Sequence, residues 1–572
     1  SGDSVRDRYQ GIIDEIEKHE KAIDTETAEK HRQRAFEKLR DAREELLDDI
    51  HADFVEAGID EITPEQVGRM EPFNWVLEFA EVYADGGFDV IVGNPPWERI
   101  KPNRDDFFSR YDPDFRTLST NQKDTRIEEI LEDDRIAKEW NEYQREIEIQ
   151  ATYFNQGEAF TRQRSKVAGR TQASENDLSS LFFERVFEIA RDDGYVSQVL
   201  PGRIFHGAPT KALREHLLDE TSVSSLISFE NHGIFDNIDN RYNFGVVTFE
   251  NNGRTETLRG IFECKDLEVL QNPEETLVDI PRDVLTGFAP SSLLFPRIQG
   301  PEDLGVLRNA VKYPAVADEN RSWYAHPTRP LGKSSDSERF FDSSEGCDYP
   351  ILTGRNFYNF SYDPTFYEGL EPPFQWSVDE GVDPEHSAKQ RIREKKMNSL
   401  KKSLYQAFGG SGSMKGFVND MLEEERGKPL SPEDVLLPST VFRIGFRRVA
   451  RGTDERTMIS AAVPPGPVCD YSFYVIDPFR INPDKSDLSE SPLHGVYEPV
   501  FSDRELFVAL GLFNSIPFDF LIRRKVDNSI PIYSFKETQV PDLSEGDEWF
   551  NYISKRAARL NCYGDDFEEM RD

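Results

Sequence analysis

The sequence predicts an α/β fold that is preceded by a helical segment and followed by a second, mixed α+β domain. Residues 1–50 are rich in Glu, Lys, Arg and Ala, with apolar residues at helical spacing, which is typical of a solvated helix or helical hairpin. Between residues 86 and 250, short β-branched runs alternate with amphipathic stretches, and this alternation indicates an α/β sheet. Beyond about residue 290, Pro, Gly, Ser and aromatic residues become more frequent, and the strand-like runs become short and irregular.

These changes divide the chain into four segments. We expect a helical segment at residues 1–70, an α/β domain at 71–290, a linker at 291–330 and the second domain at 331–572.

The α/β domain contains a clear order of predicted elements. Its first strand is Phe88–Val92, which follows a Gly-Gly turn and has the length and β-branched content of a buried parallel strand. The other predicted elements are a helical stretch at 125–150, an amphipathic helix at 177–192, a strand at 194–201, a helix at 208–219, and strands at 223–230 and 244–250.

The composition narrows the class of protein. The net charge is −38, from 107 acidic and 69 basic residues spread along the chain, and a high-salt cytoplasm is the simplest explanation for such an acidic surface. A local basic face can still bind nucleic acid. The four cysteines are far apart and form no CxxC pair, so we expect neither a metal site nor a disulfide framework, and a reducing cytoplasm fits. No apolar run approaches the length of a membrane span.

The strongest motif is Asn94-Pro95-Pro96-Trp97, which follows the strand Phe88–Val92 directly. Two prolines continue neither a strand nor a helix, so they form a stiff loop at the carboxyl end of the strand, where open α/β sheets bind their ligands. The Asn94 side-chain oxygen and the Pro95 carbonyl are acceptors that suit the two N–H donors of an exocyclic amine. The indole of Trp97 offers a flat face for a base. A plain strand-to-loop turn with a buried Trp is the alternative.

The motif and its context, FDVIVGNPPW, resemble the catalytic motif of amino-methylating enzymes, of which DNA adenine-N6 methylases are the largest group. Some RNA-guanine and protein-glutamine methylases share it, so the motif alone does not select the substrate. Over roughly residues 70–545 the chain resembles type IIG restriction-modification methylases and their phage-growth-limitation (PglX-like) relatives, in the same order of segments. The stretches YPILTGRNFYNFSYD, VFRIGFRRVARGTDERTMISAAVPPG and LFVALGLFNSIPFDFLIRRKV are similar to a TaqI-like DNA-specificity region.

This resemblance implies a Rossmann-like methyltransferase sheet and a mechanism. The target adenine is flipped out of the DNA duplex, and Asn94 and Pro95 accept hydrogen bonds from its N6 amine, which is aimed at the methyl group of S-adenosylmethionine. Trp97 stacks on the base, and Phe235 is the first candidate for a second stacking aromatic, with Tyr242 as the next. Cytosine C5 methylation needs a Cys after a Pro, and no cysteine of this chain follows one.

Basic clusters in the second domain are the predicted DNA contacts. Residues 389–402 contain seven basic residues and one acidic residue, a net charge of +6. A solvated helix face is the alternative to phosphate contact. Arginine suits both phosphates and guanine edges. The candidates are Lys395, Lys396, Lys401, Lys402, Arg443, Arg447, Arg448, Arg451, Arg523 and Arg524.

One part that the resemblance implies is missing from the sequence. Upstream of Gly86 the glycines are scattered, and none lies in the strand–turn–helix setting that binds S-adenosylmethionine. We therefore expect the cofactor-binding half on an upstream segment or on a partner polypeptide, and this chain to be the C-terminal portion of the enzyme. The alternative is a non-catalytic DNA-recognition or scaffold subunit of a defence complex.

Overall fold

The computed structural model describes residues 2–172, 176–236, 238–240, 242–321, 323, 325–332, 335–336, 349–363, 375–376, 388–409, 412–470 and 472–570. The chain forms two compact units. The first unit comprises residues 1–286 and 291–304, and the second comprises 287–290 and 305–572. Residues 291–304 of the predicted linker thus belong to the first unit.

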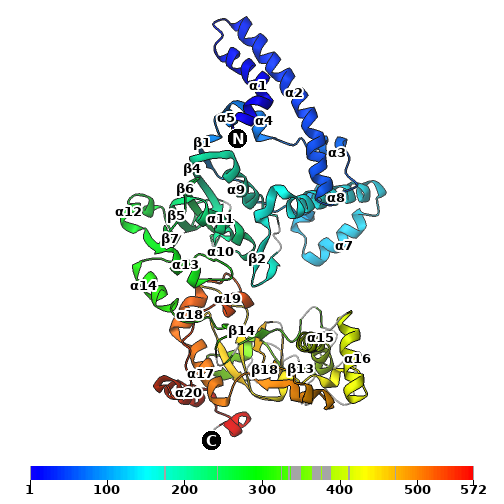
Figure 1. Cartoon of the computed structure of the whole chain (residues 1–572), viewed down its shortest axis with the longest axis vertical. Helices are drawn as coiled ribbons and strands as arrows, with labels where there is room; N and C mark the ends of the chain where they lie inside the picture. The colour runs from blue at the N-terminus through cyan, green and yellow to red at the C-terminus, as the bar shows by residue number, and fades with distance from the viewer. Residues whose placement is uncertain are drawn as a thin grey trace. The chain divides into compact units, whose positions relative to one another are not determined.

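The N-terminal segment is a helical hairpin (Figure 1) of α1 (Gly2–Glu20) and α2 (Thr25–Glu56). Asp24 caps α2 by accepting a hydrogen bond from the Thr27 amide at 2.8 Å, a common start signal for a helix. The two helices bury Ile12, Ile13 and Leu39 against each other, and their other faces are charged. Three short helices lead on to the sheet: α3 (Pro64–Arg69), α4 (Trp75–Glu78) and α5 (Ala80–Ala84).

A six-stranded mixed sheet forms the centre of the first unit, with the strand order β1-β4-β6-β5-β7-β8. Its strands are β1 (Phe88–Gly93), β4 (Ala190–Pro201), β5 (Ser222–Glu230), β6 (Asn243–Glu250), β7 (Thr257–Cys264) and β8 (Val278–Pro281). β1 is parallel to β4, and β5 is parallel to β7, whereas β6 lies antiparallel between β4 and β5. The predicted α/β fold is confirmed, and among the described residues β1 is one edge of the sheet.

Helices occur in the chain both between β1 and β4 and after β4. The stretch between β1 and β4 holds α6 (Arg104–Phe108), α7 (Thr120–Ile130), α8 (Asp134–Gln156), the hairpin strands β2 (Ser165–Val167) and β3 (Arg170–Gln172), and α9 (Leu178–Ile189). After β4 come α10 (Arg203–His206), α11 (Lys211–Asp219), α12 (Pro273–Thr276), α13 (Arg282–Phe288) and α14 (Pro301–Ala310). Tyr153 of α8 stacks on Phe54 of α2 at 4.4 Å, which joins this insertion to the helical hairpin.

The second unit is a mixed α+β structure around its own apolar core. Its main sheet has the order β15-β14-β17-β9, all antiparallel, from β9 (Pro327–Thr328), β14 (Arg443–Arg447), β15 (Ser460–Val463) and β17 (Phe473–Ile476). The short strands are β10 (Tyr349–Leu352), β11 (Phe357–Tyr358), β12 (Ser361–Tyr362), β13 (Gln375–Trp376), β16 (Val468–Cys469), β18 (Phe479–Ile481) and β19 (Tyr497–Pro499). The helices are α15 (Ala388–Phe408), α16 (Met414–Arg426), α17 (Asp503–Phe513), α18 (Ile516–Arg523), α19 (Ile532–Lys536) and α20 (Glu548–Asn561).

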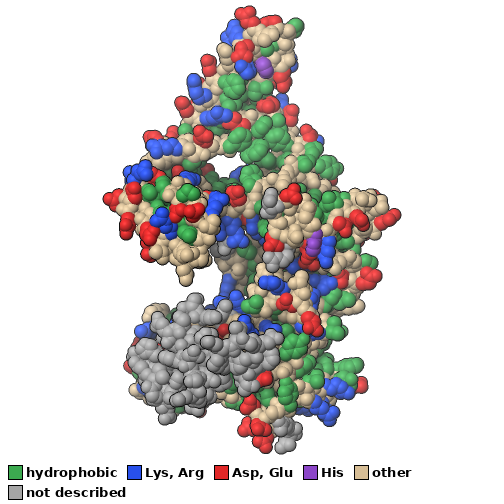
Figure 2. Space-filling view, turned by 180° about the vertical axis from the view of Figure 1, so that it is seen from behind, with side chains coloured by type: hydrophobic (Ala, Val, Ile, Leu, Met, Phe, Trp, Pro, Cys, Tyr) green, Lys and Arg blue, Asp and Glu red, His purple; other side chains and the backbone are tan. Residues whose placement is uncertain are grey.

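Two features of the whole chain bear on its surroundings. On the face that Figure 2 shows, acidic side chains are spread over the described surface and are not gathered in one patch. None of the described helices alone is long and apolar enough to cross a membrane. Among the described residues, only α17 and α18 taken together have the length and apolar composition of a membrane span, and the pair is bent by 58°. Both helices bury apolar side chains in the core of the second unit.

Candidate active site

The Asn-Pro-Pro-Trp loop begins where β1 ends, at the carboxyl end of an edge strand. Asn94 and Pro96 are exposed, Pro95 is buried and Trp97 is half-buried. The neighbouring strand β4 runs parallel to β1, with Gly93 opposite Gln198, so the residues that follow both strands emerge at the same edge of the sheet. The structure therefore places the loop where the sequence predicted it.

Trp97 lies in a cluster of aromatic rings that come from the segment before β6 and from β6 itself. The ring of Tyr242 lies nearly parallel to the indole, with the centroids 5.6 Å apart and an interplanar angle of 12°. Phe235 meets the indole edge-on at 5.7 Å, and Phe244 is tilted at 6.1 Å. Both predicted stacking candidates thus contact Trp97, and Tyr242 has the orientation that stacking needs.

A buried amide, which sequence reasoning missed, organises the loop that carries these aromatics. Asn231 has 0% exposure, and its Nδ2 donates to the carbonyls of Phe235 and Ile238, both at 3.0 Å. Its Oδ1 accepts the Phe235 amide at 2.6 Å, and its own amide donates to the Tyr242 carbonyl at 2.9 Å. An Asn directly after a strand was the available signal.

Arg203 contacts the loop and Asp177 pairs with Arg203, and neither residue was predicted. The Arg203 Nη2 donates to the Trp97 carbonyl at 3.0 Å and is paired with Asp177. Asp177 is the N-cap of α9, because its Oδ1 accepts the Ser179 amide at 2.8 Å. The backbone of the segment after Trp97 is bound to the start of α9 as well, through Leu178 N to Glu98 O at 2.9 Å.

The residues present do not fit a complete S-adenosylmethionine site. In the described part of the chain, every element before β1 is a helix, so no strand and glycine turn precede the Asn-Pro-Pro-Trp loop. β1 is an edge strand of the described sheet, and one of its faces is uncovered, since Val90 is 61% and Val92 is 78% exposed. Among the described residues, no group of three or more His, Cys, Asp or Glu side chains could hold a metal ion.

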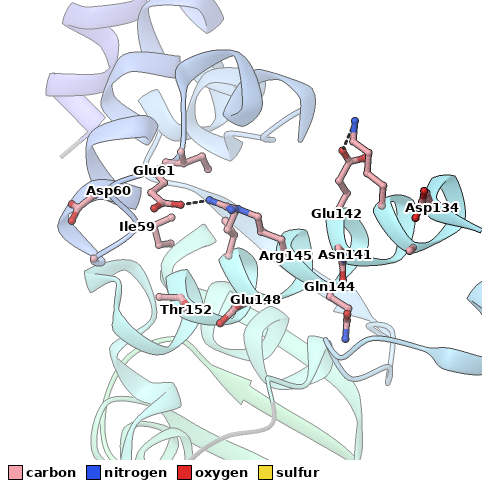
Figure 3. A pocket seen from close by; sticks show the side chains of 15 residues that line it. Ile59, Asp60, Glu61, Asp134, Asn141, Glu142, Gln144, Arg145, Glu148 and Thr152 are labelled. Atoms are coloured by element: carbon pink, nitrogen blue, oxygen red, sulfur yellow. Dashed lines mark hydrogen bonds and ion pairs between the residues drawn. The ribbon is translucent and has the colours of Figure 1, made fainter. Parts of the chain in front are cut away.

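A groove of about 990 Å³ lies elsewhere in the first unit, lined by residues 58–62 and by α8 (Figure 3). Its walls are charged. Arg145 pairs there with Glu61, and Lys138 pairs with Glu142 at 3.8 Å. No residue of the Asn-Pro-Pro-Trp loop lines it, so this groove is separate from the candidate active site.

The lysines of α15 differ in how freely they face solvent. Lys395 pairs with Asp336 at 2.7 Å, and Lys396 pairs with Asp477. Burial raises the pKa of the Asp336 carboxyl, but hydrogen bonds from Lys395, from the Gly332 amide and from Arg391 outweigh it and lower this pKa to about 2. Lys402 is exposed, and Lys401 is half-buried with a long contact of 3.4 Å to Asn398.

Arg443 is not available for DNA. It is 2% exposed and donates to the carbonyls of Val441 and Pro464 at 3.2 and 3.0 Å, and to that of Pro467. Burial lowers the pKa of its guanidinium. Since a side chain enclosed in this way reaches no phosphate, the prediction for Arg443 is wrong. The sequence motif did not show that this end of β14 is buried.

The remaining arginines lie at the end of β14, in the loop that follows it and at the end of α18. Arg523 donates to the carbonyls of Asp454 and Glu455 at 2.7 and 3.0 Å, and to Asp519, so it holds this loop from α18. Arg451 is exposed on the loop. Arg447 is half-buried and donates to the Phe357 carbonyl, Arg448 is half-buried, and the Arg524 guanidinium lies 3.4 Å from the Phe520 ring centroid.

Part of the first unit matches a known family of methylases. Residues 19–130 and 143–235 match the family model of the Eco57I restriction-modification methylase. This match includes the Asn-Pro-Pro-Trp loop, β4, β5 and Phe235. A Methanocaldococcus jannaschii protein, whose name describes a type II restriction enzyme and methyltransferase, is 34% identical over 58 residues, which is 10% of this chain and 5% of that protein.

Solved structures of restriction-modification enzymes have low sequence identity and low structural similarity to this chain. The type IIL enzyme MmeI in complex with DNA is 10% identical, with a TM-score of 0.36 over 84% of this chain and 50% of that chain. The type ISP enzyme LlaGI in complex with a DNA substrate mimic is 11% identical, with a TM-score of 0.35 over 89% and 44%. This chain thus spans half or less of each of these relatives, and at these TM-scores the likeness decides nothing about function.

Proposed function

We propose that this chain supplies the target-base pocket and the DNA-reading unit of a site-specific DNA adenine-N6 methyltransferase of a restriction-modification or phage-defence system, in a high-salt cytoplasm. One observation carries the proposal. An Asn-Pro-Pro-Trp loop ends the strand β1, and Trp97 lies against Tyr242 and Phe235. The family match over residues 19–130 and 143–235 supports a restriction-modification methylase.

The chain's own residues account for binding and orientation of the base. Flipping an adenine out of the duplex costs about a few kcal/mol, and stacking on Trp97 offsets part of this cost at about 1–3 kcal/mol per base. The Asn94 side-chain oxygen and the Pro95 carbonyl then accept the two N–H groups of the N6 amine, which fixes the direction of the nitrogen lone pair. Because Tyr242 lies parallel to Trp97, a base that enters between these rings has to separate them.

S-adenosylmethionine would supply the methyl group, and we propose that another part of the enzyme binds it. The position of β1 at the edge of the described sheet and the exposed face that carries Val90 and Val92 support this, since a bare apolar edge strand invites pairing with a further strand. The cofactor-binding half, upstream or on a partner polypeptide, would cover Val90 and Val92. We expect the 572 residues alone to bind S-adenosylmethionine weakly or not at all by calorimetry. Tight stoichiometric binding would contradict the division into halves.

DNA reading is assigned to the second unit. Lys401 and Lys402 are the proposed phosphate contacts of α15, because Lys395 and Lys396 are engaged with Asp336 and Asp477. The proposed base and phosphate contacts are Arg447, Arg448, Arg451, Arg523 and Arg524, of which Arg451 is the most exposed.

The proposal is tested with Asn94→Ala in an assembly that contains the cofactor half. Methyl transfer should be lost, while the dissociation constant for DNA stays within about twofold, since Asn94 orients the amine and does not hold the phosphate backbone. Asn252→Ala is the matched control, because Asn252 is an exposed amide that contacts Asp193 on the same unit. An Asn94→Ala assembly that methylates at the rate of the Asn252→Ala assembly would refute the assignment. A wild-type assembly that binds DNA but never methylates it would favour the scaffold alternative.

A further inference from the structure

We infer that Arg203 and Asp177 form a clamp that positions the Asn-Pro-Pro-Trp loop for the reaction, so that Arg203 is a positioning residue of the active site. This inference rests on the proposed function, because it concerns what the loop does. The hydrogen bond that decides it runs from Arg203 Nη2 to the carbonyl of Trp97, at 3.0 Å.

The topology brings these residues together from separate parts of the chain. Trp97 comes shortly after β1, and Arg203 opens α10 shortly after β4, the parallel neighbour of β1. Gly202 fixes the start of α10, because its amide donates to the Asn243 carbonyl at 2.7 Å. Arg203 thus reaches the loop from the start of α10, at the carboxyl end of the two parallel strands.

Asp177 holds Arg203 from the other side. Its carboxylate pairs with the guanidinium and also caps α9, and the two side chains are only 10% and 29% exposed. A charge-assisted contact is stronger at such low exposure than on an open surface. The backbone ladder between residues 98–100 and 176–178 adds Ile100 N to Asn176 O at 2.9 Å, so the segment after Trp97 is bound to the same N-terminus of α9.

The loop needs such a clamp because prolines restrict only part of its freedom. Pro95 and Pro96 each have a fixed φ, but rotation about ψ still turns the peptide planes that aim the Pro95 carbonyl and the Asn94 side chain. The Trp97 carbonyl lies two residues beyond the Pro95 carbonyl, and fixing it from Arg203 restricts the planes before it. A misplacement of about 1 Å in a reacting group costs about 100-fold in rate.

The test combines two variants with two readouts. Arg203→Met removes the guanidinium and keeps the apolar stem, whereas Asp177→Asn removes the charge pairing and keeps an N-cap for α9, since Asn caps as well as Asp. Amide exchange of residues 97–101 in this chain should become about tenfold or more faster in both variants. In the methylating assembly the single-turnover rate should fall about 100-fold for Arg203→Met, while the DNA dissociation constant stays within about twofold. Arg203→Lys should restore part of the rate.

The control is Arg191→Met. Arg191 also pairs with a carboxylate of β1, Asp89, at 2.9 Å, but at the opposite end of the same two strands. It should change neither readout. Unchanged exchange together with an unchanged rate would overturn the inference, and so would faster exchange with a normal rate. A slow rate with normal exchange would show that Arg203 acts without the loop, which also overturns it. Failure of the proposed function is a different result, in which the wild-type assembly itself does not methylate.

Discussion

The buried amide of Asn231 provides a prediction that needs no cofactor and no DNA. In Asn231→Ala three hydrogen bonds are lost, those with the Phe235 carbonyl, the Ile238 carbonyl and the Phe235 amide. At about 1 kcal/mol of net stabilisation each, the free energy of unfolding of the first unit should fall by about 3 kcal/mol. For a domain of more than 200 residues this lowers the melting temperature by about 5–10 °C.

The assay is thermal unfolding followed by circular dichroism, with Asn252→Ala as the matched control. Asn252 is exposed, so its replacement should change stability by less than about 0.5 kcal/mol. The loop that Asn231 holds carries Phe235 and Tyr242, so the variant should also lose adenine methylation in the assembly, even at temperatures where it is folded. A melting temperature equal to that of the control would refute the reasoning, because it would mean that the buried amide does not organise this loop.

Three further predictions concern the base, acid stability and DNA. Tyr242→Ala should weaken binding of DNA with a flipped 2-aminopurine by about 1–3 kcal/mol, and Phe235→Ala should weaken it by less, because of these two rings only that of Tyr242 is parallel to Trp97. Fluorescence titration measures both losses, and a larger loss for Phe235→Ala would contradict the assignment of Tyr242 as the stacking residue. The folded-state pKa of Asp336 is lowered from 3.8 to about 2, so its contribution of about 2 kcal/mol is present above pH 4 and is lost as the pH falls through about 2. Asp336→Asn should therefore be less stable than the wild type in urea at pH 7, and the difference should shrink by pH 3; a difference that does not depend on pH would contradict the pairing with Lys395. Neutralising Lys401 and Lys402 should lower the log–log salt slope of DNA binding by up to about 0.9 for each lost phosphate contact, with equal effect on all sequences. Arg451→Ala, as the loss of a base contact, should instead weaken the binding free energy by about 1–3 kcal/mol at one base pair of the site. Titrations in which none of these variants changes the affinity for DNA would contradict the assignment of DNA reading to the second unit.

The sequence predicted the parts of the first unit in which local pattern decides structure. The β-branched run before the prolines is β1, which is parallel to β4 as expected but is a partly exposed edge strand and not the buried strand that was predicted. The strand expected at 194–201 lies within β4, and the strands expected at 223–230 and 244–250 are β5 and β6. The helical stretch at 125–150 is two helices, α7 and α8. The antiparallel placement of β6 between β4 and β5 could not be predicted, because strand order depends on long-range pairing and leaves no period in the sequence.

The sequence predicted the motif of the candidate site but not the polar residues that hold the motif and its aromatic neighbours in place. The Asn-Pro-Pro-Trp loop follows from residue chemistry next to a strand, whereas its aromatic neighbours were expected from the family resemblance. Asn231, Arg203 and Asp177 are ordinary polar residues whose partners are backbone carbonyls, amides or each other, and such partners are known only once the chain is folded. The prediction that Arg443 contacts DNA was wrong for the same reason, since an arginine in such a motif can lie on the surface or in the interior.

The most direct test of the central claim is to identify the atom that receives the methyl group. The chain is combined with its cofactor-binding half, S-adenosylmethionine with a labelled methyl group and duplex DNA, and the nucleosides of the digested DNA are separated by mass spectrometry. The label should appear in N6-methyl-2′-deoxyadenosine for the wild type and be absent for Asn94→Ala. Label in a methylated deoxycytidine or in the protein itself, or in N6-methyl-2′-deoxyadenosine made equally well by Asn94→Ala, would contradict the account.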